Sequence, residues 1–123
     1  MEFSQPKGIY QQIAEQMRDR ILAGEWQEGE RIPSVRELAG GVGVNPNTVT
    51  KSYQALLDRE IIENQRGLGY FVAPDARKRI VSQMREEFVR DELPRVFRTM
   101  RVLGLQLTDL EPHFARSNEE PTP

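Results

Sequence analysis

The middle of the chain contains two helix-start signals with only a glycine-rich stretch between them. Ser34 and Glu37 have the spacing of a capping box, in which each side chain hydrogen-bonds to the backbone of the other residue. Asn45 and Pro46 combine a favourable N-cap with a residue suited to the first helical position. Three glycines lie between these signals, and glycine is a poor helix former. The sequence therefore predicts a short helix ending near Ala39, a tight turn and a second helix.

An amphipathic helix is expected before this turn and a β-hairpin after it. The apolar face of the first helix consists of Ile9, Ile13, Met17 and Ile21, which recur at every fourth position. Gly24 ends that pattern, and the loop "GEWQEGERIPS" follows, anchored by Trp26 and Ile32. The segment "IIENQRGLGYFVA" places β-branched and aromatic residues around a Gly-Leu-Gly centre. This pattern predicts a hairpin with its tip at residues 66–69.

Helical periodicity returns after the hairpin. The first stripe contains Ile80, Val81, Met84 and Phe88. A further helix is expected from near Glu92 to Gly104, with a proline in its first turn. Thr108 and Glu111 have capping-box spacing for a last short helix through about Phe114.

Composition limits the chemistry that this chain can perform. The 123 residues have a mean hydropathy of −0.63 and contain no apolar run of membrane-spanning length. The N-terminus lacks the features of a secretory signal, so we expect a cytoplasmic protein with no membrane partner. The absence of cysteine and the single histidine, His113, give no support for a metal site, a cofactor or a nucleophile-base pair. We therefore expect no metal, no cofactor and no enzyme activity.

The charge balance adds a second limit. The net charge is −2 and the isoelectric point about 5.5, which argues against indiscriminate binding to polyanions. Any positively charged surface must therefore be local.

The order helix, short helix, glycine turn, helix, hairpin is that of a winged helix-turn-helix. Ala39, Gly43 and Val49 have the spacing of that motif: a small residue where the helices touch, a glycine in the turn and a β-branched residue under the second helix. The buried side of the second helix is expected to contain Val49, Tyr53, Leu56 and Leu57. The N-terminal end of such a helix enters the major groove, where short polar side chains suit base edges and free N–H groups suit phosphate.

The stretch "GERIPSVRELAGGVGVNPNTVTKSYQALLDREIIENQRGLGYFV" closely resembles the DNA-binding domain of the GntR family of bacterial transcription regulators. The shared features are a proline-serine step, an R-x-L-A segment, the helix-turn-helix and a glycine-rich wing. The resemblance covers roughly residues 9–73, with Ile32 where members often have leucine. Residues 74–123 are too few for the large effector domains or the fused aminotransferase of other branches, and they are similar to the short helical tail of the YtrA-type branch. That similarity implies a homodimer formed through the C-terminal helices, often encoded near genes for membrane transporters.

The resemblance also implies which residues contact DNA. They are Arg36, Asn45, Asn47, Thr48, Thr50 and Lys51 around the two helices, and Arg66, Gly67 and Gly69 at the wing. Arginine can hold a guanine edge or clamp a phosphate, and asparagine can read adenine. Threonine can donate to phosphate or contact a thymine methyl group, and lysine suits phosphate. The arginine at the hairpin tip could enter the minor groove.

Other interpretations remain open for several of these positions. Arg36 could be a solvated helix residue paired with Glu37 or Glu30. Asn45 could serve only as an N-cap, and the two wing glycines could serve only the turn.

The C-terminal helices carry more apolar surface than a tail of this size can bury alone, which favours a dimer interface over an intramolecular core. The expected interface consists of Phe88, Leu93, Val96, Phe97, Met100 and Leu103. The predicted organisation is therefore a winged helix-turn-helix DNA-binding domain over residues 1–74, a helical dimerisation segment over 75–116 and a disordered tail over 117–123. The fold class is mainly α with a small β-hairpin.

Two functions follow from these patterns. The first is a homodimeric, sequence-specific DNA-binding regulator, most simply a repressor, that recognises an inverted-repeat operator. The alternative is a winged-helix module that binds another protein. A protein partner would favour apolar or aromatic anchors on the exposed face of the second helix, and this sequence has Asn, Thr and Lys there. No residue marks a site for a small-molecule effector.

Overall fold

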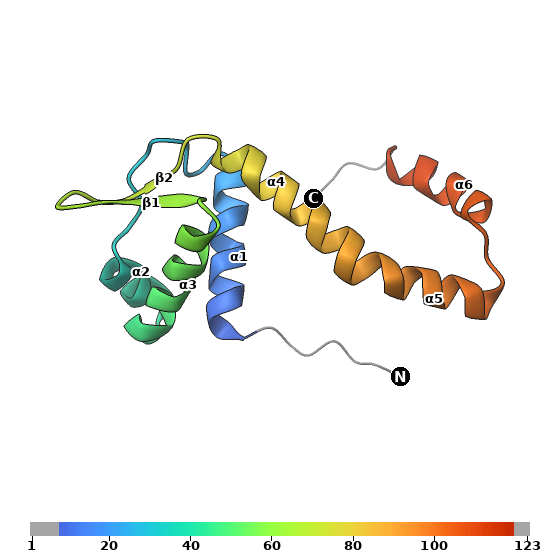
Figure 1. Ribbon diagram of the computed structural model, residues 1–123, viewed down its shortest axis with the longest axis horizontal. Helices are drawn as coiled ribbons and strands as arrows, with labels where there is room; N and C mark the ends of the chain where they lie inside the picture. The colour runs from blue at the N-terminus through green and yellow to red at the C-terminus, as the bar shows by residue number, and fades with distance from the viewer. Residues whose placement is uncertain (1–7, 120–123) are drawn as a thin grey trace. The chain divides into compact units, whose positions relative to one another are not determined.

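The computed structural model describes residues 8–119 and divides into two compact units, Met1–Gln83 and Met84–Pro123. The elements of the first unit are α1 (Ile9–Leu22), α2 (Val35–Val42), α3 (Pro46–Asp58), β1 (Ile62–Gln65), β2 (Gly69–Val72) and most of α4 (Ala76–Glu87) (Figure 1). The second unit contains the end of α4, the π-helical segment η1 (Phe88–Glu92), α5 (Leu93–Leu103) and α6 (Leu107–Ser117). The predicted fold class, mainly α with one small hairpin, is confirmed.

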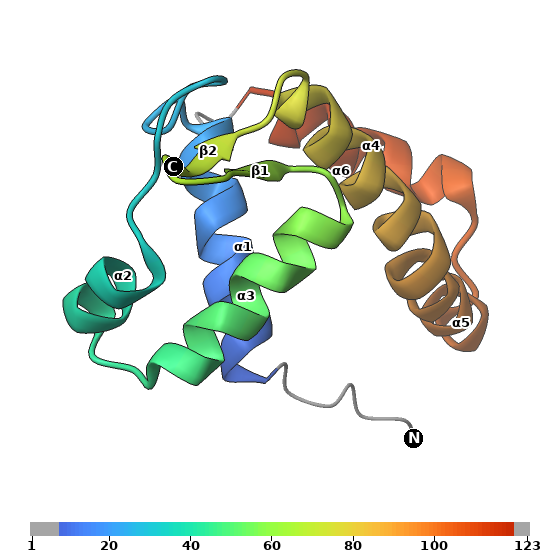
Figure 2. The same cartoon turned by 60° about the vertical axis from the view of Figure 1, so that its left-hand side comes forward.

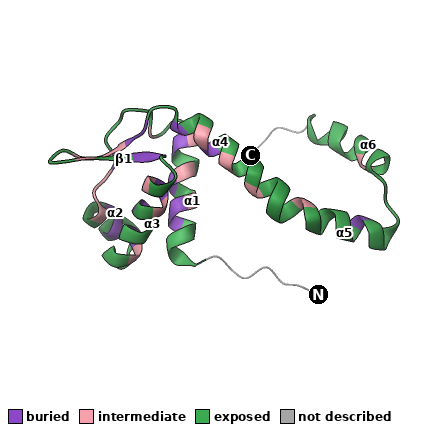
Figure 3. Cartoon of the chain, in the orientation of Figure 1, coloured by how far each residue is buried: buried purple, intermediate pink, exposed green. Residues whose placement is uncertain are grey.

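The core of the first unit lies between α1, α3 and the base of the hairpin (Figure 3). Its side chains include Ile13, Met17 and Ile21 from α1, Val49, Tyr53 and Leu56 from α3, and Ile62 and Val72 from the strands. Burial of an aliphatic side chain of this size contributes about 1.5–3 kcal/mol. The predicted apolar faces of both helices are thus confirmed, except that Ile9, at the open end of α1, is 54% exposed.

The predicted capping box of α2 is present, but the helix is longer than expected. The Glu37 amide donates to Ser34 Oγ at 3.1 Å, and the Ser34 amide donates to Glu37 Oε1 at 3.2 Å. The expected end near Ala39 is wrong, because α2 continues through two glycines to Val42. Each of those glycines weakens a helix by about 1 kcal/mol relative to alanine, which is not enough to stop it. Gly43, with φ +71°, is the residue that ends the helix in the left-handed conformation.

The start of α3 is confirmed as predicted. Asn45 is the N-cap, and its Oδ1 accepts a hydrogen bond from the Asn47 amide at 2.8 Å. Pro46 occupies the first turn, where its missing N–H costs nothing. Further along α3, the helix is fixed to α1 through Ser52, whose buried hydroxyl donates to the carbonyl of Tyr10 at 2.8 Å.

The hairpin forms as predicted and gains a third backbone segment. β1 and β2 pair antiparallel, with Ile62 opposite Val72 and Gln65 opposite Gly69. The loop before α2 pairs with the other edge of β2: the Ile32 amide donates to Tyr70 O at 2.9 Å, and the Val72 amide donates to Glu30 O at 2.9 Å. This segment was expected only as an anchored loop. Its pairing ties the start of α2 to the hairpin.

In the second unit, helical residues continue from α4 into α5 through η1, where a separate helix start near Glu92 was expected. Pro94 is the second residue of α5, two positions after the end of the π-helical segment. A proline inside a helix lacks a donor and clashes with the carbonyl four residues earlier, and a widened turn at this point accommodates both effects. The predicted end at Gly104, which has φ +70°, is confirmed.

The expected start of the last helix at Thr108 is wrong. The N-cap of α6 is Gln106, whose amide donates to Asp109 Oδ2 at 2.8 Å. Because this capping pair lies two residues before the predicted one, Thr108 falls inside the first turn of the helix. The helix then runs beyond Phe114 to Ser117, so that the first residue of the expected tail is helical. Residues 120–123 of that tail lie outside the described residues.

Candidate nucleic-acid interface

The elements that were expected to contact DNA lie on one side of the first unit. α2, the start of α3 and the tip of the hairpin all project to the left in Figure 1, away from the end at which α4 begins. The view in Figure 2 brings this side forward and shows the turn between α2 and α3 at its lower edge. The structure thus brings the predicted DNA-binding residues of the two helices and the wing to one side of the unit.

The first turns of α3 separate polar and buried residues cleanly. The side chains of Asn45, Asn47, Thr50 and Lys51 are exposed and Thr48 is half-buried, while Val49, Ser52 and Tyr53 are buried. Because the buried residues fix the helix on α1, the polar residues must face solvent. The exposed end of α3 consequently presents amide, hydroxyl and ammonium groups and no aromatic or large aliphatic anchor.

Hydrogen bonds within α3 determine which polar groups remain available to an external partner. Asn45 uses Oδ1 for the helix cap, which leaves its NH₂ group to donate to another partner. Thr50 donates its hydroxyl hydrogen to Pro46 O at 3.0 Å, so that its methyl group and its acceptor lone pairs remain available. Across residues 8–119, no hydrogen bond engages the side chain of Asn47, which therefore keeps its full donor and acceptor set.

Arg36 is exposed on α2, and the two acids proposed as its partners are occupied elsewhere. The carboxylate of Glu37 accepts from the Ser34 amide, and this backbone bond, assisted by the Ser34 hydroxyl, holds the pKa of Glu37 below its usual value. Glu30 Oε2 accepts from the Gln27 amide at 3.1 Å. Within the described part of the chain, no ion pair holds Arg36, and the same is true of Lys51. These cations are free to meet an external anion.

The tip of the wing has a conformation that requires glycine. Gly67 has φ +80° and Gly69 has φ +117°, both in the region that disfavours other residues. Arg66 is exposed in the turn between the strands. Leu68, which the sequence interpretation passed over, is 63% exposed at the same tip. An apolar side chain beside an arginine is suited to the sugar edges of a minor groove, and its position within a Gly-Leu-Gly turn was the available signal.

A tyrosine pair supports the wing from behind. Tyr53 of α3 donates a hydrogen bond through its hydroxyl to Pro33 O, and its ring meets Tyr70 of β2 edge-on, with 4.9 Å between ring centroids. Burial raises the pKa of Tyr53 to about 12. The expectation that Tyr53 belongs to the core is confirmed, and its contacts join α3, the hairpin and the segment that leads into α2.

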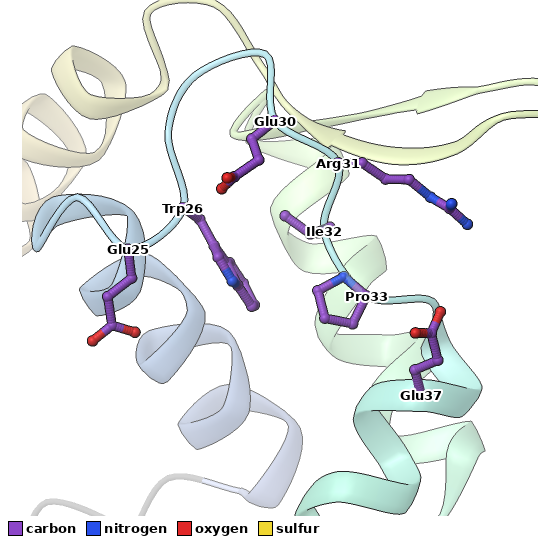
Figure 4. Close-up of a pocket in the computed structure, with 7 residues that line it drawn as sticks. All are labelled: Glu25, Trp26, Glu30, Arg31, Ile32, Pro33 and Glu37. Carbon is purple, nitrogen blue, oxygen red and sulfur yellow. The ribbon is translucent and has the colours of Figure 1, made fainter.

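A hollow of about 460 Å³ opens beside this segment (Figure 4). Its lining residues are Glu25, Trp26, Glu30, Arg31, Ile32, Pro33 and Glu37. The indole of Trp26 already lies under the guanidinium of Arg20, 5.1 Å from the ring centroid, and two of the carboxylates hold backbone amides. These groups are engaged within the fold.

The residues of the expected dimer interface differ in accessibility. Phe88, Val96, Phe97 and Leu103 are exposed, Leu93 is half-buried, and Met100 is only 7% exposed within a single chain. Met100 is therefore buried within its own chain. Further large apolar side chains are exposed on the same helices: Val89, Val102, Leu105, Leu107 and Phe114. Val89 lies in η1, Leu105 in the turn after α5, and Leu107 and Phe114 on α6, outside the helix for which the stripe was predicted, whereas Val102 lies on α5 and was not assigned to that stripe.

Other kinds of site find no support in the residues that are described. Between residues 8 and 119 there is no group of three or more His, Asp or Glu side chains placed to hold a metal ion. Over the same span, no helix has the length and apolar character needed to cross a membrane. His113 is exposed on α6, with Nδ1 2.9 Å from an Arg116 nitrogen.

Comparison with known proteins agrees with this geometry. The family model described as "Bacterial regulatory proteins, gntR family" matches residues 9–72. The chain belongs to the gntR family. The matched span contains α1, the helix-turn-helix and the complete hairpin, so that the fold of the first unit is a winged helix.

Full-length relatives define the branch. The HTH-type transcriptional repressor YtrA of Bacillus subtilis is 35% identical over 102 residues, which cover 83% of this chain and 78% of YtrA. The uncharacterised HTH-type regulator YhcF of the same organism is 38% identical over 104 residues, covering 85% of this chain and 84% of YhcF. A crystal structure of a GntR-family regulator from Bacteroides thetaiotaomicron has 40% identity and a TM-score of 0.81, and the match covers 91% of this chain and 97% of that one.

The gntR-family chain thus lies in the YtrA-like branch. It is a DNA-binding transcription regulator, not an enzyme. Because these matches extend beyond the winged helix, the C-terminal helices are part of the shared architecture.

Proposed function

We propose that the protein is a homodimeric repressor that binds an inverted-repeat operator. The observation that carries the proposal is the exposed end of α3, where Asn47 and Lys51 have no partner within residues 8–119. A protein that needed these side chains for its own fold would have paired them. Amide and ammonium groups at a helix N-terminus match base edges and phosphates.

Each residue has a role in this proposal that follows from its geometry. Asn47 reads a base through its unengaged amide, and Arg36 reads a base or clamps a phosphate from α2. Lys51 contacts phosphate. Thr48 supports the same contacts from a half-buried position, and Thr50 offers its methyl group because its hydroxyl hydrogen is held by Pro46 O.

The wing adds a second contact. Arg66 enters the minor groove from the hairpin tip, and the two glycines at 67 and 69 let the backbone approach the DNA closely. Asn45 serves as helix cap and donates its remaining NH₂ group to phosphate. A single recognition helix and wing cover one half-site.

Dimerisation supplies the second half-site. The exposed apolar residues of η1 and α5 include Phe88, Val96, Phe97 and Leu103, and their burial against a second copy removes them from water. A two-fold dimer binds a two-fold operator, in which the two half-sites are inverted. Occupation of such a site near a promoter excludes the transcription machinery, which is repression. The relative YtrA is named a transcriptional repressor.

The proposal also covers the cellular location of the protein and its target genes. A regulator of chromosomal DNA works in the cytoplasm, and the YtrA-like branch favours target genes for membrane transporters. The alternative function, a protein-binding winged helix, lacks the exposed apolar anchors on α3 that a protein interface favours.

In vitro selection tests the proposal. Random duplexes are incubated with the purified full-length protein, and bound molecules are recovered, amplified and sequenced. Enrichment of two inverted copies of one short motif is expected. Enrichment of a single motif without a repeat would contradict the dimeric operator, and recovery of random sequence would contradict sequence-specific binding. Searching for the repeat upstream of genes then tests the link to transporters.

A further inference from the structure

Arg31 occupies a position on the wing that spacing along the sequence does not reveal. It lies in the segment that pairs with the free edge of β2, directly opposite Phe71. Paired residues of an antiparallel ladder point to the same face of a sheet. In Figure 4 the Arg31 side chain points away from Trp26 and Glu30. Its guanidinium therefore extends along the wing, although Arg31 also contributes to the lining of the hollow.

The contact with Gly69 fixes this placement. A Cβ atom at Gly69 would lie 3.1 Å from Nε, 3.6 Å from Nη2 and 3.7 Å from Cζ of Arg31. The guanidinium thus rests on the backbone of the first residue of β2, next to the turn that carries Arg66. Glycine at this position leaves the room that the cation occupies.

The charge of Arg31 is not neutralised by a nearby acid. Within residues 8–119, the guanidinium makes no hydrogen bond and no ion pair, and the residue is exposed. Arg31 contributes only the weakest of the interactions that lower the pKa of Glu37, and that carboxylate is bound to Ser34. Glu30, on the same segment as Arg31, accepts from the Gln27 amide, and Glu63 lies on β1, on the other side of Phe71.

We propose that Arg31 is a second cation of the wing, which binds a phosphate beside the groove that the hairpin tip enters and thereby positions the wing on DNA. The inference rests on the DNA-binding function proposed above and adds a contact from outside both helices of the helix-turn-helix. A positioned guanidinium with free donors suits a phosphate. A backbone contact of this kind contributes affinity without reading sequence.

The first test compares Arg31→Ala with the wild-type protein by fluorescence anisotropy on the selected duplex and on a scrambled duplex. The variant should weaken binding to both duplexes by the same factor and reduce the salt slope by about one for each protomer bound. The ratio of wild-type to variant affinity should then fall about threefold per protomer between 50 and 200 mM salt. Arg116→Ala, which removes the same charge from α6, should leave the slope unchanged.

The second test identifies the phosphate. Duplexes with one neutral methylphosphonate are scanned across each half-site. At one position per half-site, the substitution should weaken the wild-type protein and have no effect on Arg31→Ala. Absence of any such position, or an unchanged salt slope, would overturn the inference. If the wild-type protein itself fails to select a sequence or to bind DNA, the proposed function fails instead, so that the two failures are distinguishable.

Discussion

Asn45 has two separable tasks, and paired substitutions can separate them. Its Oδ1 caps α3 through the 2.8 Å bond from the Asn47 amide, and its exposed NH₂ group is proposed to donate to phosphate. Asn45→Ala removes both groups. Asn45→Ser retains a good capping oxygen but removes the amide donor.

The structure sets the expected magnitudes. Loss of an N-cap costs about 1 kcal/mol, because the amide at the helix start loses its partner. For a domain of 60–100 residues, this corresponds to a fall in melting temperature of about 4–8 °C. The free energy of unfolding of Asn45→Ser should lie within about 0.5 kcal/mol of the wild-type value. A hydrogen bond to a charged group such as phosphate contributes about 1.5–3 kcal/mol, so both variants should bind the selected duplex about 10- to 150-fold more weakly.

Thermal unfolding, monitored by circular dichroism, measures the change in stability. Fluorescence anisotropy measures the affinity for the selected duplex. Equal stability of Asn45→Ala and the wild-type protein would refute the capping role. A serine variant that is as stable and binds as tightly as the wild-type protein would refute the DNA contact and leave Asn45 as a cap alone.

Further substitutions test the other parts of the site. Arg36→Ala should lose about 1–3 kcal/mol on the selected duplex and relax discrimination at one base pair; a uniform loss on all sequences would make it a phosphate contact. Lys51→Ala should weaken all duplexes equally and lower the salt slope by about one, and a loss limited to one base position would contradict this. Phe97→Asp should yield monomers in sedimentation velocity, whereas Phe114→Asp, on α6 outside the expected interface, should remain dimeric; a dimer that survives the first change would move the interface elsewhere. Because burial raises the pKa of Tyr53 from 10.0 to about 12, its contribution to stability is complete below pH 10 and is lost as the pH rises towards 12. Tyr53→Phe should therefore lose less stability across that interval in denaturant titrations, and an identical pH profile would refute the role of burial.

Local hydrogen bonding explains most of what the sequence predicted correctly. The caps at Ser34 and Asn45 depend on contacts two or three residues apart, and the hairpin turn depends on two glycines that are two positions apart. Such features are determined within one turn of backbone. They are accordingly visible without knowledge of the tertiary structure.

The errors occurred where local signals competed. The three glycines after Ala39 were expected to end α2 near that residue, but the helix continues through the first two and ends at Gly43. At α6, the sequence offered Thr108 with Glu111 and also Gln106 with Asp109, and the second pair forms the cap. Threonine is among the preferred N-cap residues and glutamine is not, so that preference alone selected the wrong start.

Tertiary contacts account for what was missed. The pairing of residues 30–32 with β2 joins segments that are distant in sequence, and only that pairing brings Arg31 onto Gly69. Met100 has the spacing of an interface residue, yet it is buried within its own chain. Helical periodicity identifies an apolar face but does not determine which partner covers it.

The most direct measurement of the central claim is an anisotropy titration of the selected inverted repeat and a scrambled duplex at two salt concentrations, with sedimentation of the complex to determine its stoichiometry. A dimeric operator-binding regulator places two chains on one duplex and binds the repeat about 10³-fold or more tightly than the scrambled sequence. Equal weak binding to both duplexes, or one chain per duplex, would contradict it.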